Sequence, residues 1–162
     1  MNNQFTIIIA DDDKDDHEFL IDAIHEQNKE SQILSVFDGT ELMDVLLGVN
    51  KNNDPSFAKP DLIFLDLNMP LMDGYEVLQT VRRNDALKSI PIYVLTTSEF
   101  EFDKIKAVAY GANAFYSKPM LPGGLKKIVE EVLSKHIPSI KVKDKKSHEQ
   151  NEIHMNNAKK AS

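Results

Sequence analysis

The sequence predicts an α/β fold in which a parallel β-sheet is covered on both faces by helices. Short, continuous apolar runs such as FTIIIA at 5–10 and DLIFL at 61–65 are typical of strands that are buried on both faces. Longer segments between such runs place apolar residues at helical spacing. Because strands and helices therefore alternate along the chain, a parallel sheet with helical crossovers is expected.

The first two strand–helix pairs lie before residue 50. The strand at 5–10 leads into a predicted helix over 13–30. A β-rich run at 33–37 stops at Asp38-Gly39, and a second helix follows from Thr40. The apolar stripes that predict these helices are Phe19, Leu20, Ala23 and Ile24 in the first, and Leu42, Val45, Leu46 and Val49 in the second.

Three further pairs follow a polar loop over 50–60, which contains Pro55 and Pro60. Their strands are predicted at 61–65, 90–95 and 114–116. A turn-rich stretch at 66–74, with Pro70 and Gly74 as turn formers, precedes the third helix. The helices are predicted from the stripe Val77, Leu78 and Val81, from the segment 100–110 with Gly111 as C-cap, and from the stripe Leu121, Leu125, Ile128, Val129, Val132 and Leu133.

Five such units with right-handed crossovers leave few topologies. We expect the flavodoxin-like (βα)5 arrangement, a doubly wound parallel sheet with strand order 2-1-3-4-5. Its ligand site lies outside the carboxyl ends of the strands, where the first and third strands meet. The folded domain is predicted to span 1–137. Pro138 ends the last helix, and 138–162 is expected to be a charged, disordered tail because apolar residues are sparse there.

Composition excludes several classes of protein. With 41% hydrophobic and 28% charged residues, the 162-residue chain is neither wholly disordered nor fibrous. Because it contains no cysteine, it has no thiol nucleophile, iron–sulfur cluster or cysteine-based zinc site. No apolar run approaches the roughly 18 residues that span a bilayer, and the N-terminus lacks the features of a signal peptide. A cytoplasmic protein without membrane insertion is expected.

The charge is unevenly distributed. The net charge is −7, but residues 138–162 hold six lysines against three acidic residues, so the preceding 137 residues carry −10. A body this acidic repels phosphate backbones, and we expect no binding of nucleic acid. Six acidic residues fall within eight positions: Asp11, Asp12, Asp13, Asp15, Asp16 and Glu18. Such crowding is unfavourable unless a cation or solvent relieves it.

Polar side chains follow four of the predicted strands. Asp11 and Asp12 come after the first strand, Asp66 after the third, Thr96 after the fourth and Lys118 after the fifth. In the expected strand order, these ends lie side by side at one edge of the sheet. Three carboxylates, a hydroxyl and an ammonium therefore converge there.

This combination suits phosphoryl transfer. Three neighbouring carboxylates do not all stay ionised without a cation, and hard oxygen ligands select Mg²⁺ or a similar ion such as Mn²⁺. A carboxylate can attack phosphorus to give an aspartyl phosphate. The metal, a lysine and a hydroxyl then neutralise and orient the transferring oxygens.

Four motifs, in this order and spacing, support a more specific interpretation: IIIADDD, DLNMPLMDG, IYVLT and FYSKP. Over about residues 5–136 the chain resembles the receiver domains of two-component response regulators, particularly the stand-alone type of bacterial chemotaxis. The resemblance implies that Asp66 is the phosphoacceptor, with Thr96 hydrogen-bonding the phosphoryl group and Lys118 pairing with it.

The resemblance also implies a metal site and a switch. Asp12 would bind Mg²⁺ directly, Asp11 would act through water or as a second carboxylate, and the backbone carbonyl of Asn68 would complete the shell together with Asp66. Phe115 falls where the family has a switching aromatic residue that follows the threonine. As a phenylalanine it can act through packing but not through a hydroxyl hydrogen bond.

The implied function is that of a single-domain response regulator rather than an enzyme acting on an external substrate. It would catalyse its own phosphorylation by a sensor histidine kinase or histidine phosphotransfer domain, and its own dephosphorylation. A downstream protein would dock on the surface formed by 100–110, 114–116 and the last helix. The protein would be a monomer or a dimer linked to phosphorylation.

Other interpretations of the same residues stay open. The cluster from Asp11 to Asp16 also fits a helix N-cap with a solvated first turn, Thr96 could cap a helix, and Phe115 could be a core residue. The histidines show no ligand spacing and are expected at the surface, and the Lys118–Pro119 bond is a candidate cis peptide.

Two alternative functions use the same fold. A metal-dependent phosphatase with an aspartyl nucleophile resembles the haloacid dehalogenases, which need a second Asp two residues after the nucleophile. That position is Asn68, which cannot protonate a leaving group. A receiver-like scaffold that is never phosphorylated is the other alternative, and the complete acidic set argues against it.

Overall fold

The predicted fold is confirmed in a computed structural model, which describes residues 4–49 and 59–140. Five parallel strands form one sheet in the order β2-β1-β3-β4-β5. The strands are β1 (Thr6–Ala10), β2 (Gln32–Val36), β3 (Leu62–Leu65), β4 (Ile92–Thr96) and β5 (Ala114–Ser117). The helices are α1 (Lys14–Gln27), α2 (Gly39–Leu46), α3 (Gly74–Arg83), α4 (Glu101–Ala109) and α5 (Pro122–Ser134).

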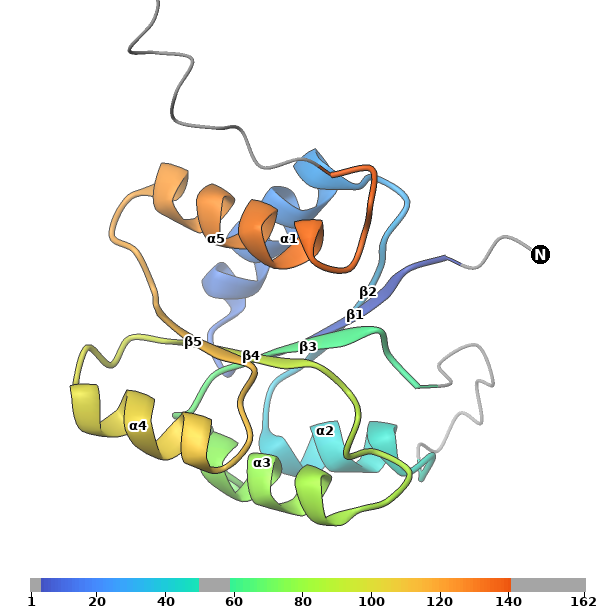
Figure 1. The fold of residues 1–162 in the computed structure, drawn as a ribbon, viewed down its shortest axis with the longest axis vertical. Coiled ribbons are helices and arrows are strands. Elements are labelled where there is room, and N and C mark those ends of the chain that lie inside the picture. The colour runs from blue at the N-terminus through green and yellow to red at the C-terminus, as the bar shows by residue number, and fades with distance from the viewer. Residues whose placement is uncertain (1–3, 50–58, 141–162) are drawn as a thin grey trace, which may run out of the picture.

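The helices cover both faces of the sheet. Figure 1 shows α1 and α5 on one face and α2, α3 and α4 on the other. Successive side chains of a strand point to opposite faces, so Ile7 and Ile9 of β1 pack in the cluster with α1 and α5, and Ile8 packs in the cluster with α2 and α3. This is why the central strands consist of apolar residues without alternation, as the sequence indicated.

Several element ends differ from the predicted ones. Helix α1 ends at Gln27 rather than near residue 30, and α2 ends at Leu46, shortly before Gly48, which has a φ of 69°. Leu121 does not belong to the apolar stripe of α5, because it is the N-cap residue and its side chain is 75% exposed. Apolar spacing predicts the body of a helix better than its ends.

The backbone geometry differs from one expectation and refines another. The Lys118–Pro119 peptide bond is trans, since no cis peptide occurs among the described residues. The left-handed residue of the turn at 66–74 is Leu71, with a φ of 65°, whereas Gly74 is the first residue of α3. Gly74 donates its backbone N–H to the carbonyl of Leu67 at 3.0 Å and so fixes how α3 begins.

The chain stays packed beyond the predicted domain end at 137. Ile137 and Ile140 contact the apolar cluster beneath α1 and α5. Most of the loop predicted at 50–60 and residues 141–162 of the predicted tail lie outside the described residues. Among the helices that the structure describes, none is long and apolar enough to cross a bilayer.

Candidate functional site

The residues predicted from the strand ends meet at one edge of the sheet. Asp11 directly follows β1 and Asp66 directly follows β3, while Thr96 is the last residue of β4 and Lys118 directly follows β5. Because the strands are parallel, their carboxyl ends share this edge. The backbone N–H of Asp66 donates to the carbonyl of Ala10 at 2.9 Å, which ties the ends of β3 and β1 together.

Three carboxylates of this edge form a group that could hold a metal ion. Asp11, Asp12 and Asp66 each offer a carboxylate oxygen, and these oxygens lie within 4.8 Å of one another. Asp11 and Asp66 are buried, with 5% exposed surface each, whereas Asp12 is exposed. An all-oxygen ligand set with one solvated carboxylate fits Mg²⁺ or Mn²⁺, which keep water in their shell.

Burial makes the ionised form of Asp11 costly. The loss of solvent raises the pKa of Asp11 above its usual value, although hydrogen bonds from the Lys118 ammonium and the Asp13 backbone work in the opposite direction. A bound cation would relieve this cost, because it favours the charged form of all three carboxylates.

The Lys118 ammonium lies among the carboxylates. Its Nζ is 3.0 Å from Oδ2 of Asp66, 2.6 Å from Oδ2 of Asp11 and 2.6 Å from Oδ2 of Asp16. Burial acts to lower the pKa of Lys118, but the hydrogen bonds to Asp11 and Asp16 outweigh it and hold the pKa above its usual value. Lys118 therefore stays charged beside the predicted phosphoacceptor.

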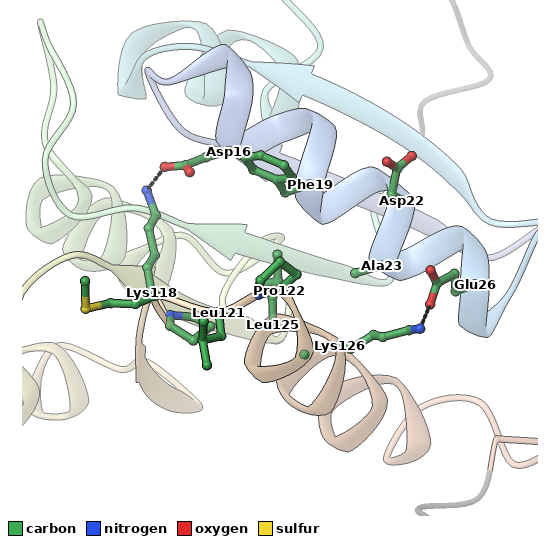
Figure 2. Close-up of a pocket in the computed structure, with 13 residues that line it drawn as sticks. Asp16, Phe19, Asp22, Ala23, Glu26, Lys118, Leu121, Pro122, Leu125 and Lys126 are labelled. Atoms are coloured by element: carbon green, nitrogen blue, oxygen red, sulfur yellow. Dashed lines mark hydrogen bonds and ion pairs between the residues drawn. The ribbon is translucent and has the colours of Figure 1, made fainter.

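Asp16 is the site residue that the sequence analysis missed. It lies in the first turn of α1, and its carboxylate reaches across a groove to Lys118, as Figure 2 shows. The sequence contains the signal, since Asp16 is part of the acidic cluster. Nothing in the cluster distinguishes Asp16 from its neighbours before the fold places α1 opposite the segment after β5.

The acidic cluster also caps a helix, as the alternative interpretation predicted. Asp13 is the N-cap of α1, and its side chain accepts hydrogen bonds from the backbone N–H groups of Asp15 and Asp16. The residues of the cluster therefore have different roles. Asp13 caps the start of α1, while Asp11 and Asp12 lie beside Asp66 at the edge of the sheet.

His17 is a second residue that the sequence analysis placed wrongly. It was expected at the surface, but only 3% of it is exposed. Nε2 lies 2.7 Å from the Asp11 carbonyl oxygen and Nδ1 lies 2.9 Å from the Ser35 hydroxyl. A carbonyl only accepts, so Nε2 carries the proton that it shares with Asp11. His17 thereby supports the turn that presents Asp11.

The remaining predicted residues lie at the same edge with different partners. Thr96 is fully buried, its hydroxyl oxygen accepts a long hydrogen bond of 3.5 Å from the Ser98 N–H, and its carbonyl accepts from the Lys118 N–H at 2.7 Å. Asn68 donates its backbone N–H to Oδ1 of Asp66 at 3.2 Å. Phe115 is half-buried in β5 and packs against the apolar cluster beneath α2, α3 and α4.

The loop after β4 is held by its own polar network. The Ser98 hydroxyl donates to Oδ2 of Asp103 at 2.5 Å, and the Tyr75 hydroxyl donates to Oδ1 of Asp103 at 2.7 Å. The Ser117 hydroxyl donates to the Ser98 carbonyl at 2.8 Å. These contacts connect the loop to α4, to the start of α3 and to β5.

Comparisons with known proteins agree with this geometry. The family model of the response regulator receiver domain matches residues 7–130. The response regulator Rcp1 of Synechocystis is 33% identical over 129 residues, which are 79% of this chain and 86% of Rcp1.

Solved structures give the same result. The phosphorylated cyanobacterial phytochrome response regulator RcpA has a TM-score of 0.73 and 31% identity, covering 80% of this chain and 91% of RcpA. The Mn²⁺-bound form of Rcp1 has a TM-score of 0.74 and 30% identity, covering 86% and 99%. The chemotaxis response regulator CheY4 of Vibrio cholerae has a TM-score of 0.63 and 27% identity, covering 80% and 99%.

Proposed function

Since the chain belongs to the response regulator receiver domain family, we propose that it is a signalling switch that accepts a phosphoryl group on Asp66. One observation carries the proposal: a buried carboxylate, Asp66, lies 3.0 Å from the Lys118 ammonium and within 4.8 Å of two further carboxylates that can share a cation with it. Lys118 alone does not balance three neighbouring carboxylates, whereas a cation shared with it would.

In the proposed reaction, an oxygen of the Asp66 carboxylate attacks the phosphorus of a phosphohistidine. The new O–P bond forms as the N–P bond breaks, and the departing imidazole nitrogen keeps the electron pair. Lys118 donates to the phosphoryl oxygens next to the new bond, and the Thr96 hydroxyl hydrogen-bonds another of them. Positioning and charge neutralisation supply most of the catalysis that phosphoryl transfer requires.

Asp11, Asp12 and Asp66 would hold the Mg²⁺ or Mn²⁺ ion, together with the backbone carbonyl of Asn68. The ion would neutralise the negative charge that collects on the phosphoryl oxygens. The similarity to Rcp1, which has been solved with Mn²⁺ bound, supports this assignment.

We propose that phosphorylation changes the surface formed by α4, β5 and α5. Thr96 and Phe115 connect the site to this surface, because Phe115 pairs with Val94 of β4 and lies three residues before Lys118 in the chain. Helix α4 and the residue before it expose four large apolar side chains, each more than 50% accessible: Phe100, Phe102, Ile105 and Val108. Exposed apolar groups of this extent favour a protein partner.

A sensor histidine kinase or a histidine phosphotransfer domain is the proposed donor, in the cytoplasm, with a monomer or a phosphorylation-linked dimer as the acting form. The phosphatase alternative is weaker, because Asn68 occupies the position of the required acid. An unphosphorylated scaffold is the third candidate.

Incubation with acetyl phosphate and Mg²⁺, followed by mass spectrometry of the intact protein, separates the three functions. We expect a mass increase of one phosphoryl group that is absent in Asp66→Ala and in samples containing EDTA. Asp85→Ala is the matched control, since the Asp85 side chain is 94% exposed and lies outside the group of carboxylates at the sheet edge. Multiple turnover of phosphomonoesters would instead establish a phosphatase, and no reaction would establish a scaffold.

A further inference from the structure

We propose that Asp16 is a positioning residue for Lys118: a carboxylate outside the metal-ligand group that holds the ammonium beside the phosphoacceptor. The inference rests on the proposed function, since it assigns Asp16 a role in transfer to Asp66.

The Lys118 ammonium has as many N–H donors as it has carboxylate partners. The group has three N–H donors and no acceptor. Three carboxylates lie within ion-pair distance, Asp11 and Asp16 at 2.6 Å and Asp66 at 3.0 Å. Removal of any one carboxylate leaves a donor to find another partner.

Asp16 differs from the other two partners in one respect. Asp11 and Asp66 belong to the group that can hold a metal ion, together with Asp12. Asp16 does not belong to that group. A cation held by this group would compete with Lys118 for the oxygens of Asp11 and Asp66, because Lys118 already pairs with both carboxylates. Asp16 is therefore the partner that Lys118 does not share with the ion.

The fold anchors both ends of this ion pair. Asp16 lies in the first turn of α1, where the Asp13 side chain accepts hydrogen bonds from the N–H groups of Asp15 at 2.9 Å and Asp16 at 3.4 Å. Lys118 is fixed by the hydrogen bond from its N–H to the Thr96 carbonyl. The two side chains meet across the groove between α1 and the segment after β5 (Figure 2).

The pair lies at the border between pocket and solvent. The Asp16 side chain is 35% exposed and the Lys118 side chain 13% exposed. Lysine is a flexible side chain that carries a point charge, so its ammonium stays in one place only where its partners hold it. Without the Asp16 carboxylate, Lys118 would spend less time in the position that meets the incoming phosphoryl group.

The first test compares Asp16→Asn with Asp15→Asn. Both residues are acidic and lie in the first turn of α1, but Asp15 is exposed, is not among the carboxylates that pair with Lys118, and serves as the matched control. With acetyl phosphate and Mg²⁺, we expect Asp16→Asn to slow phosphorylation about threefold to tenfold, and Asp15→Asn to change it less than about twofold. An unchanged rate in Asp16→Asn would overturn the proposal.

A double-mutant cycle distinguishes positioning from a structural effect. In a Lys118→Met background, the substitution Asp16→Asn has no ammonium to release, so we expect no further loss of rate. An equal loss in both backgrounds would show that Asp16 acts on the fold of α1 instead. Mn²⁺ affinity measured by electron paramagnetic resonance should change less than about threefold, since Asp16 is not a ligand; a larger loss would contradict the assignment.

The outcome for the wild-type protein separates the two proposals. If the wild type takes up no phosphoryl group at all, the proposed function fails and the role of Asp16 fails with it. If the wild type, Asp15→Asn and Asp16→Asn are phosphorylated at the same rate, the proposed function stands and only the role of Asp16 is wrong.

Discussion

At the scale of single residues, the electrostatics of the site follow from an excess of acid. The Lys118 ammonium pairs with three carboxylates, those of Asp11, Asp16 and Asp66. The exposed carboxylate of Asp12 lies close to two of them, so acidic groups outnumber the ammonium. Burial of Asp11 favours its protonated form, so the raised pKa reports a native state that holds this proton more tightly than the unfolded chain does.

The effect of Asp11 on stability therefore depends on pH. A group with a raised native pKa contributes stability at low pH and loses it as the pH rises above the unfolded value, which is 3.8 for Asp11. We expect the stability of Asp11→Asn relative to wild type to increase as the pH rises from about 4 to about 7. Urea unfolding in the presence of EDTA measures this, with Asp15→Asn as a surface control. A stability difference that does not change with pH would contradict the explanation.

Residue contacts across the fold are what the sequence could not predict. Asp11, Asp12, Asp66, Thr96 and Lys118 could be found because each follows or ends a strand, and strand ends of a parallel sheet meet. The role of Asp16 depends on where α1 lies relative to the segment after β5. The burial of His17 depends on partners in two other segments, Ser35 and the Asp11 carbonyl.

At the scale of elements, the start of α3 packs tightly against the end of β3. A Cβ at Gly74 would lie 2.4 Å from the Asp66 carbonyl oxygen and 2.8 Å from the Leu67 Cα, both of which are backbone atoms. Gly74 has no positive φ, so glycine is needed here because of the close approach and not because of the backbone conformation. The start of α3 thus packs directly against the backbone of Asp66.

The substitution Gly74→Ala is expected to displace α3 from the end of β3. We expect a loss of stability of about 1–3 kcal/mol and slower phosphorylation of Asp66, because backbone atoms must shift. Gly123→Ala is the matched control: it also lies in the first turn of a helix, and no atom lies within 4 Å of its added Cβ. The control should be neutral or stabilising by up to about 1 kcal/mol. Equal behaviour of the two variants in urea unfolding would refute this account.

Elements were predictable to the extent that their signals are local. The stripe of Val77, Leu78 and Val81 predicted α3, and all three residues are buried. The end of α1 and the position of Leu121 were not predictable, because helix ends depend on caps and on tertiary contacts. Pro91 shifted the start of β4 to Ile92, since proline has no N–H for a ladder.

At the scale of the whole molecule, the strand order places the site where two crossovers diverge. The connection after β1 leads to α1 on one face of the sheet, and the connection after β3 leads to α3 on the other (Figure 1). The topology rule places ligand sites at this edge. The fold class and the meeting of Asp11, Asp66, Thr96 and Lys118 at one edge could be predicted, because alternating strands and helices imply a parallel sheet whose carboxyl ends lie together.

Metal binding should stabilise the whole fold. A cation that binds the native carboxylates but not the unfolded chain adds about 1.4 kcal/mol at ten times its dissociation constant. For a domain of this size we expect Mg²⁺ to raise the melting temperature by about 3–5 °C, and EDTA to reverse the change. In Asp12→Asn the shift should shrink. Calorimetry with Mg²⁺ and with EDTA measures the change in melting temperature for both proteins. An identical change in Asp12→Asn would place the ion elsewhere.

The fastening of the loop after β4 has a mechanical consequence. Ser98 is attached through its hydroxyl to Asp103 of α4 and through its carbonyl to Ser117 of β5. A displacement of Thr96 therefore shifts Ser98 and, through these two hydrogen bonds, both α4 and β5. The helix and the strand are expected to move together rather than independently.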